Sequence, residues 1–484
     1  MSASFRLSSL ALALLLAGCT VGPDHVRPQF TTSDQFLRSE TTITTSPSAS
    51  AASEAAFWQR FDDPLLTGLV EDALRANHDL RIGLARLDQA RALSRQSRFD
   101  LFPTVTAEAG ASESRASADQ APGVSRADRD TESRDAAALL SWELDLFGRV
   151  RRGVQAQRAD SDAVAADLAA LQVSVVAELS QAYFDLRGRQ AQLAVARGNA
   201  DNQRGSLDLV AVRLEAGRGT ELDTARAGAQ LESTLSRIPA LEAEVAAHMH
   251  RIAVLTGRTP DALVAQLEAP QALPVLLDPI AAGAPADLLR RRPDIAAAEH
   301  RLEAATARIG VATADLFPRF TLGGLIGSQA SGGGDLFGRD SETRLVALGV
   351  DWSFLDVGRV RARLAAAEAG ADEHLARYQQ TVLRALEETE TALVRYQNAR
   401  TERVHLEAAA NASARGAELA RLRFEGGLID FLQVLDAERT RLEAEDQLAQ
   451  SQARTATALV AVYRALAGGW PEQAPEREHI AAAD

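Results

Sequence analysis

The segment Leu140-Ser-Trp-Glu-Leu-Asp-Leu-Phe-Gly-Arg-Val-Arg151 decides the fold, because its key residues occur twice in the chain. Trp142 recurs as Trp352, and Gly148-Arg-Val-Arg151 recurs as Gly358-Arg-Val-Arg361, both 210 residues later. Three further pairs follow the same order: Asp100-Leu-Phe-Pro103 with Asp315-Leu-Phe-Pro318, Arg213-Leu-Glu-Ala-Gly217 with Arg423-Phe-Glu-Gly-Gly427, and Leu255-Thr-Gly257 with Leu466-Ala-Gly468. Their separations are 215, 210 and 211 residues. Five ordered pairs with a nearly constant offset predict two copies of one structural unit.

Each copy has the same predicted order of parts. A helix comes first, at about 64–99 and again at 285–315, opened by Asp63-Pro64 and by Ala284-Pro285. Two short stretches of alternating polarity follow. A very long helical region then covers about 148–257 and 358–467, and each is interrupted once by glycine, near Gly217-Arg-Gly219 or Gly426-Gly427.

The alternating stretches have the period of two that is typical of strands. In 139–147, Leu140, Trp142, Leu144 and Leu146 share one face, opposite Ser141, Glu143 and Asp145. In 345–355, Leu348, Val350, Trp352 and Phe354 oppose Ala347, Gly349, Asp351 and Ser353. Weaker alternation in 105–111 and 320–326 supplies the partner strands, and the polar segments 112–135 and 328–344 connect them. The pattern predicts one hairpin in each copy, at about 103–147 and 318–356.

Alternation alone also fits a soluble antiparallel sheet with one wet face. Strands of about ten residues with long polar loops fit a membrane β-barrel, but a barrel needs about eight strands or more. Two hairpins supply only four strands. A barrel would therefore need two or three chains, with eight or twelve strands.

Apolar residues in the long helical regions recur in steps of three and four. The series are Val164, Leu168, Leu171, Val175, Leu179, Ala182 and Leu186 in the first copy, and Leu375, Tyr378, Val382, Leu386, Thr389, Leu393 and Tyr396 in the second. Arms of about 55 residues would be about 80 Å long. Such helices form a tunnel wall or, as an alternative, a dimeric coiled-coil rod.

The first eighteen residues have the pattern of a secretory signal: Arg6 is followed by the apolar stretch Leu10-Ala-Leu-Ala-Leu-Leu-Leu16. Leu16-Ala-Gly-Cys19 resembles a bacterial lipobox, and Cys19 is the only cysteine. We therefore predict lipid attachment at Cys19, with an ordinary signal and an incidental cysteine as the alternative. The next residue is Thr20, and this choice of residue resembles that of lipoproteins directed to the outer membrane. Residues 19–56 are predicted to be a lipidated tether.

Composition and motifs argue against several classes of function. The net charge of −14 disfavours nucleic acid as a partner, and all 52 basic residues are arginine, so no P-loop lysine exists. No zinc-protease or serine-hydrolase motif occurs, and His248-Met-His250 has a spacing that points the two rings apart. Past residue 30, no unbroken run of eighteen apolar residues exists. We expect no enzyme activity, no metal and no cofactor. The alternative of a polymer-degrading enzyme would need a pair of acidic residues in a cleft, and the sequence offers no candidate pair.

Several motifs carry a family resemblance: Cys19-Thr-Val-Gly-Pro-Asp24, Phe61-Asp-Asp-Pro-Leu65 after Trp58, Asn77-His-Asp-Leu80, Trp142-Glu-Leu-Asp-Leu-Phe-Gly148, Leu289-Arg-Arg-Arg-Pro-Asp-Ile295 with Ala298-Glu299, and Val434-Leu-Asp-Ala437. Together they span almost the whole mature chain. The chain resembles the TolC-like outer-membrane efflux proteins, and within them the lipoprotein branch of the nodulation-protein-T type. The resemblance implies a mostly α, internally duplicated fold. It also implies a homotrimer with a twelve-stranded outer-membrane β-barrel that continues into a periplasmic α-helical barrel.

Function by resemblance is the outer-membrane channel of a tripartite efflux system, carrying drugs or other small molecules outward. The implied partners are further copies of the chain, a periplasmic adaptor, an inner-membrane transporter and outer-membrane lipid. A non-conducting lipoprotein coiled-coil scaffold that bridges the envelope is the alternative.

The resemblance also implies a gate at the periplasmic helix–turn–helix tips. The aspartate that narrows the pore in the family matches Asp436, while Gln433 stands where some members carry a second aspartate. Glu221 and Asp223 are predicted near the other tip, and Gly217 and Gly427 are predicted hinges. Three copies of Asp436 would form a ring of negative charge that attracts cations.

These observations predict the following domains: a signal peptide at 1–18, the tether at 19–56, a first repeat at 57–257, a linker at 258–284, a second repeat at 285–468 and a C-terminal tail at 469–484.

Overall fold

The computed structural model describes residues 20–33, 35–37, 56–273, 285–332 and 334–467. The signal peptide, Cys19, most of the predicted tether and the tail lie outside these residues. The chain divides into two compact units. The strand unit combines 1–29, 87–165 and 297–380, and the helix unit combines 30–86, 166–296 and 381–484. Each repeat contributes residues to both units.

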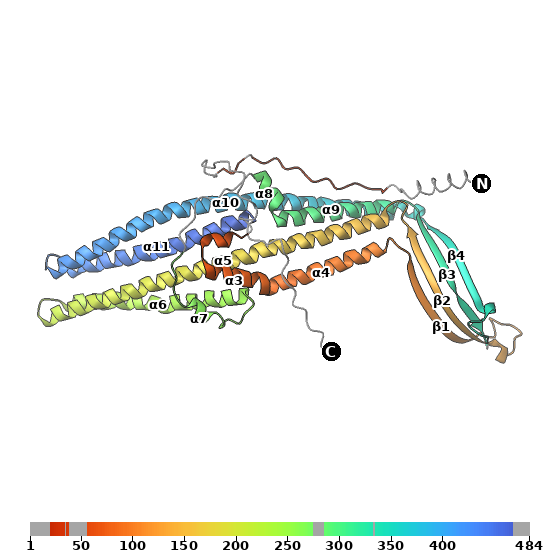
Figure 1. The fold of residues 1–484 in the computed structure, drawn as a ribbon, viewed down its shortest axis with the longest axis horizontal. Helices are drawn as coiled ribbons and strands as arrows, with labels where there is room; N and C mark the ends of the chain where they lie inside the picture. The colour runs from red at the N-terminus through yellow and green to blue at the C-terminus, as the bar shows by residue number, and fades with distance from the viewer. Residues whose placement is uncertain (1–19, 34, 38–55, 274–284, 333, 468–484) are drawn as a thin grey trace. The chain divides into compact units, whose positions relative to one another are not determined.

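The strand unit contains one antiparallel sheet of four strands in the order β1-β2-β3-β4 (Figure 1). The strands are β1 (Thr104–Arg115), β2 (Asp130–Leu144), β3 (Arg319–Ser331) and β4 (Glu342–Asp351). β2 pairs with β3 in the register Leu140↔Gly324, so the two hairpins form one continuous sheet. Gly327 is required there, because a Cβ would lie 2.4 Å from the Ala136 carbonyl oxygen. The prediction of two hairpins is confirmed.

The strand boundaries differ from the prediction at both ends. The connections are shorter than 112–135 and 328–344, because the polar residues of 112–115 pair with 130–133 of β2. Backbone hydrogen bonds thus continue the ladder where the side chains no longer alternate. Asp145 does not belong to a strand face, since its carboxylate accepts hydrogen bonds from Val150 N and Arg151 N (3.1 and 2.9 Å) at the start of the next helix. Trp352 and Phe354 likewise lie beyond the end of β4.

The helix unit contains two helical hairpins (Figure 1). Residues of α5 (Arg149–Glu215) pair with α6 (Glu221–Leu255), and residues of α10 (Val357–Glu425) pair with α11 (Phe431–Ala465). The predicted interruptions near Gly217 and Gly427 are confirmed. The expectation of two arms of equal length is wrong, because the outgoing helices have 67 and 69 residues and the returning ones 35 each.

Each predicted first helix is divided in two. The pieces are α3 (Pro64–Ala76) and α4 (His78–Phe99) in the first copy, and α8 (Pro285–Arg291) and α9 (Pro293–Ala314) in the second. The short α7 (Val264–Leu267) lies within the predicted linker 258–284. Asn77 and Arg292 stand at the breaks, and each side chain donates to the last carbonyl of a returning helix. Asn77 Nδ2 bonds Leu255 O (2.9 Å), and Arg292 Nη1 bonds Ala465 O (3.0 Å).

Equivalent contacts in the two copies show which residues correspond to each other. Trp142 Nε1 and Trp352 Nε1 each donate to the leucine carbonyl of an Asp-Leu-Phe-Pro motif, Leu101 O and Leu316 O, both at 3.1 Å. At the other end, Gly257 and Ala467 both have positive φ (72° and 58°) after the returning helix. The pairing of Leu255-Thr-Gly257 with Leu466-Ala-Gly468 is therefore wrong by one residue, and the true offset there is 210, as at the tryptophans.

The motif around Asp63 connects α3 to α5 inside the helix unit. Asp63 Oδ1 accepts from Leu65 N and Leu66 N and caps α3, as expected from Asp-Pro. Its other oxygen accepts from Tyr183 Oη (2.5 Å), and Phe61 packs edge-on against Phe184. Burial and the Asp63 carboxylate raise the pKa of Tyr183, which keeps the hydroxyl protonated as the donor.

One helix in the described residues, α5, includes an eighteen-residue stretch apolar enough to cross a membrane by length and composition, and half of that stretch is buried. The sequence search for unbroken apolar runs did not find this stretch, because a few polar residues interrupt it. Its Ala and Val residues nevertheless give it a high mean hydropathy. Core helices of soluble bundles have the same composition, so this stretch is weak evidence for a spanning helix.

Candidate functional site

The candidate site is the pair of helix–turn–helix tips, at 216–220 and 426–430 in the helix unit. In both copies, the chain leaves the outgoing helix by the same turn. Gly217 N donates to Leu214 O (2.9 Å) and Arg218 N to Arg213 O (2.8 Å); Gly427 N and Leu428 N make the equivalent bonds, at 2.9 and 2.8 Å. This is the Schellman motif, in which a residue of positive φ ends the helix. Gly217 and Gly427 have φ values of 67° and 73°.

The two returning helices begin differently. Thr220 caps α6, and Asp223 completes a capping box: Thr220 Oγ1 accepts from Asp223 N (3.2 Å), and the Asp223 carboxylate accepts from Thr220 N (3.3 Å). At the start of α11, the Asp430 side chain makes no cap hydrogen bond. Asp223 therefore has a structural role that its sequence position did not reveal, while Glu221 is exposed in the first turn.

Asp436 is exposed in the second turn of α11, and its carboxylate accepts a hydrogen bond from Arg439 (2.9 Å). At the repeat offset of 210, its counterpart in the first copy is Arg226, whereas Asp223 corresponds to Gln433. The predicted acidic residues thus occupy non-equivalent positions on the two tips. Among the described residues, the ion-pair partner of Asp436 is Arg439.

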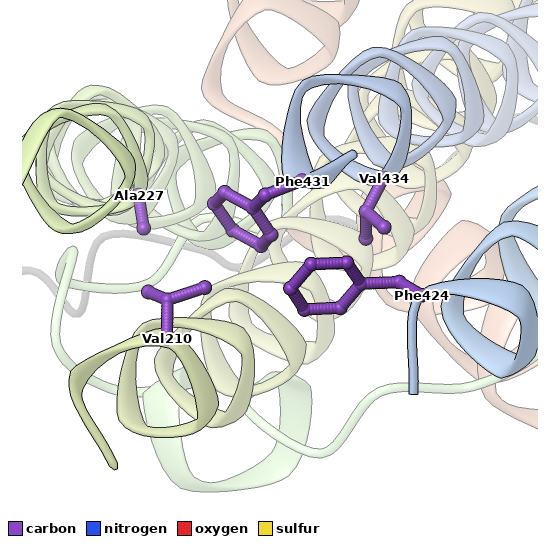
Figure 2. Close-up of a cluster of buried hydrophobic side chains, with 5 residues drawn as sticks. All are labelled: Val210, Ala227, Phe424, Phe431 and Val434. Carbon is purple, nitrogen blue, oxygen red and sulfur yellow. The ribbon is translucent and has the colours of Figure 1, made fainter. Parts of the chain in front are cut away.

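A small apolar cluster holds the two tips together (Figure 2). Its buried members come from four helices: Val210 of α5, Ala227 of α6, Phe424 of α10, and Phe431 and Val434 of α11. The two phenylalanine rings lie 5.3 Å apart and face Val210 and Ala227 of the first hairpin. Burial of a Val or Phe side chain in this cluster contributes about 1.5–3 kcal/mol relative to exposure, and burial of the Ala227 methyl group contributes less.

Arg213 strengthens the same junction. Its Nη2 donates to Phe424 O (2.8 Å) and Glu425 O (3.1 Å), the last carbonyls of α10, and its guanidinium lies 4.0 Å from the centroid of the Phe424 ring. A cation at a helix C-terminus is favourable, as is one over an aromatic face. Sequence reasoning found the Arg213-to-Gly217 repeat but not this role. The signal was present, because the second copy places Phe424 where the first has Leu214.

Residues 20–24, which follow Cys19, are held in the strand unit. Val21 N donates to Phe147 O (3.2 Å), and Arg152 donates to Val21 O (3.2 Å) and pairs with Asp24 (2.8 Å). Arg152 is 4% exposed, whereas the Asp24 side chain is 84% exposed. Gly148 has φ of 84°, and a Cβ there would lie 2.7 Å from Thr20. The residue that follows Cys19 is thus held beside the start of α5.

Within the described part of the chain, no three side chains of the metal-ligating types come together.

Comparison with known proteins decides the family. The sequence pattern for outer membrane efflux proteins matches residues 69–258 and again 284–468. The chain belongs to the outer membrane efflux protein family. The match to this family in two segments also confirms the predicted duplication.

Relatives cover nearly the whole chain. The outer membrane protein OprJ of Pseudomonas aeruginosa is 34% identical over 97% of both chains, and a nodulation protein T of Rhizobium leguminosarum bv. viciae is 30% identical over 98% of this chain and 96% of its own. Among solved structures, the outer-membrane channel OprN is 42% identical, with a TM-score of 0.85 over 93% of this chain and 100% of its own. The Campylobacter jejuni CmeC outer membrane channel has the same fold at 22% identity, with a TM-score of 0.86 over 93% and 95% of the two chains.

Membership of this efflux family confirms three predictions. The chain is an efflux channel component of the cell outer membrane with a periplasmic helical extension, and its fold is that of the known channels. It is not an enzyme. Family membership favours the channel over the non-conducting scaffold.

Gly→Ala substitutions at a tip turn and inside a helix should change the free energy of unfolding in opposite directions. Gly217→Ala places a Cβ on a backbone of positive φ and should lower the free energy of unfolding by about 1 kcal/mol. Gly228→Ala, inside α6 and without heavy atoms near the new Cβ, should raise it by about 0.5–1 kcal/mol. Thermal unfolding of the purified variants measures both. Equal shifts of the same sign would contradict the assignment of the turn.

Proposed function

We propose that this chain forms a homotrimeric exit duct of a tripartite efflux pump, with a twelve-stranded barrel in the outer membrane. The observation that carries the proposal is the sheet, in which β1 and β4 are edge strands. Every residue of β1 is exposed, and so is nearly every residue of β4. Edge strands with free backbone groups invite pairing with another chain, and closure into a barrel removes them.

Names of relatives support the pump. A toluene efflux pump outer membrane protein, TtgF of Pseudomonas putida, is 30% identical over 96% of both chains. By analogy, the partners would be an inner-membrane transporter and a periplasmic adaptor. The tips offer the adaptor a surface of exposed apolar side chains, Leu222, Leu422, Leu428 and Leu432. The repeats proposed as structural units remain 57–257 and 285–468, separated by the linker 258–284.

The gate proposal places Asp436 of three chains around the periplasmic opening, with Glu221 and Asp223 nearby and Gly217 and Gly427 as the positions where the tips bend. Its support is the exposure of Asp436 and the apolar cluster behind it, which would let the two tips move together as one body. Arg439 neutralises part of the charge in the isolated chain. A ring of three carboxylates would recruit cations in addition.

Planar-bilayer conductance tests the duct and the gate together. The wild type should show discrete openings that divalent cations block from the periplasmic side, and Asp436→Ala should weaken that block several-fold by removing the ring of charge. Glu443→Ala is the control, because Glu443 is an exposed carboxylate one to two turns further along α11. Oligomers that never conduct would contradict the duct. Openings with an unchanged block in Asp436→Ala would refute the gate alone.

We also propose that Cys19 carries the lipid of the lipoprotein branch. The lipobox-like Leu16-Ala-Gly-Cys19 supports it, and the clamp on Thr20 and Val21 would hold the anchor beside the base of the strands. Mass spectrometry of the purified protein should find an N-terminal peptide that begins at Cys19 and carries a diacylglyceryl group and an acyl chain. An unmodified Cys19 peptide would contradict lipidation.

A further inference from the structure

A ladder of polar contacts joins α5 of the first copy to α11 of the second. Three side chains of α5, spaced seven residues apart, donate to carboxylates of α11: Gln192 to Asp446 (2.8 Å), Asn199 to Glu445 (3.0 Å) and Ser206 to Glu438 (2.7 Å). The three donors are buried, at 4%, 5% and 3% exposure. Seven-residue spacing keeps them on one line of the helix. We call this line of contacts the carboxylate seam.

The three carboxylates differ in whether an arginine forms an ion pair with them. Asp446 pairs with Arg237 of α6 (2.9 Å), and Glu445 pairs with Arg441 one turn earlier on α11 (2.7 Å). Among the described residues, Glu438 has no ion-pair partner within bonding distance. Its Oε1 accepts from the neutral Ser206 hydroxyl, while its buried Oε2 has no hydrogen bond. A partly buried carboxylate whose only hydrogen-bond donor is neutral is held poorly in its charged form.

A polar cavity of about 140 Å³ adjoins this carboxylate, between α5, α10 and α11. Gln203 of α5 lines the same cavity, is 3% exposed, and has no hydrogen bond at either its amide oxygen or its amide nitrogen. An orphaned amide and an orphaned carboxylate oxygen around one space large enough for water constitute a built polar site. A neutral carboxyl group is both donor and acceptor, which is what an amide requires of a partner.

We propose that Glu438 is a protonation site, at which the bound proton lets the carboxyl group complete the seam by donating to the Gln203 amide oxygen. The charges that face Glu438 come from two helices. Arg421 and Glu418 lie on α10, and Arg441 lies on α11; α5 contributes only amides and the Ser206 hydroxyl. The cavity is large enough to admit water, which would give protons access to Glu438. The site is intramolecular, so it goes beyond the duct and does not depend on the proposed gate.

Burial raises the pKa of Glu438 above its ordinary value, against the opposing effects of the Ser206 hydrogen bond and of Arg421 and Arg441. Since the folded pKa exceeds the unfolded one, the protonated group stabilises the fold most below its ordinary pKa of about 4.5. That contribution is lost as pH rises through the folded pKa. Mild acidification should therefore tighten the seam and rigidify the adjoining tips.

Infrared difference spectroscopy of the full-length protein in detergent measures the protonation directly. The wild-type spectrum minus that of Glu438→Gln isolates one protonated carboxyl band, whose midpoint should lie above about 4.5. Ser206→Ala removes the hydrogen bond that favours the charged form, so it should raise the midpoint by about one pH unit. Gln203→Met removes the acceptor for the proton at similar volume, so it should lower the midpoint. Glu443→Gln, on the exposed face of α11, should leave the midpoint unchanged.

Hydrogen exchange at the tips, corrected for the intrinsic pH dependence, reports the consequence. Protection of α5 and α11 around the seam should rise as the wild type is acidified through the measured midpoint. Glu438→Gln should be protected at all pH values and show no step. No isolated band, a midpoint at or below the ordinary value, or shifts of the same sign in Ser206→Ala and Gln203→Met would overturn the proposal. A step in Glu438→Gln equal to that of the wild type would overturn it also.

Discussion

Both edges of the four-stranded sheet carry backbone N–H and C=O groups without a strand partner, and this constraint governs the rest of the structure. β1 and β4 are exposed along their lengths, and within the strand unit they belong to a single layer. A single sheet of four strands cannot bury an apolar face against itself. In the proposed trimer, strands of neighbouring chains would pair with both edges, so assembly would be part of the fold.

Duplication supplies the four strands of this sheet from two copies of one structural unit. The two copies repeat the same contacts at their joints, where each tryptophan indole bonds the preceding motif and Asn77 or Arg292 holds the end of a returning helix. The copies differ where they touch each other. Arg213 binds the end of α10, and the neutral donors of α5 bind the carboxylates of α11. Symmetric joints build the frame, while asymmetric contacts lock one hairpin onto the other.

The sequence was sufficient for the parts that depend on local chemistry. Period-two stretches, glycines at helix ends and the Asp63-Pro64 cap predicted the strands, the tips and the start of α3. It was insufficient where a distant partner decides. The breaks at Asn77 and Arg292 need the carbonyls of Leu255 and Ala465, far along the chain. The sequence also did not show that Asp223, predicted near the tip, completes a local capping box, or that the contact with Thr20 depends on the positive φ of Gly148.

The central claim is that the exposed edges are closed by copies of the same chain. Native mass spectrometry of the full-length protein, released from detergent micelles, tests it most directly, because it counts chains without assuming their arrangement. The account predicts one species of three chains, each of about 51.6 kDa before lipidation and signal removal. A stable folded monomer, or a dimer with the same strand content, would contradict the twelve-stranded closure.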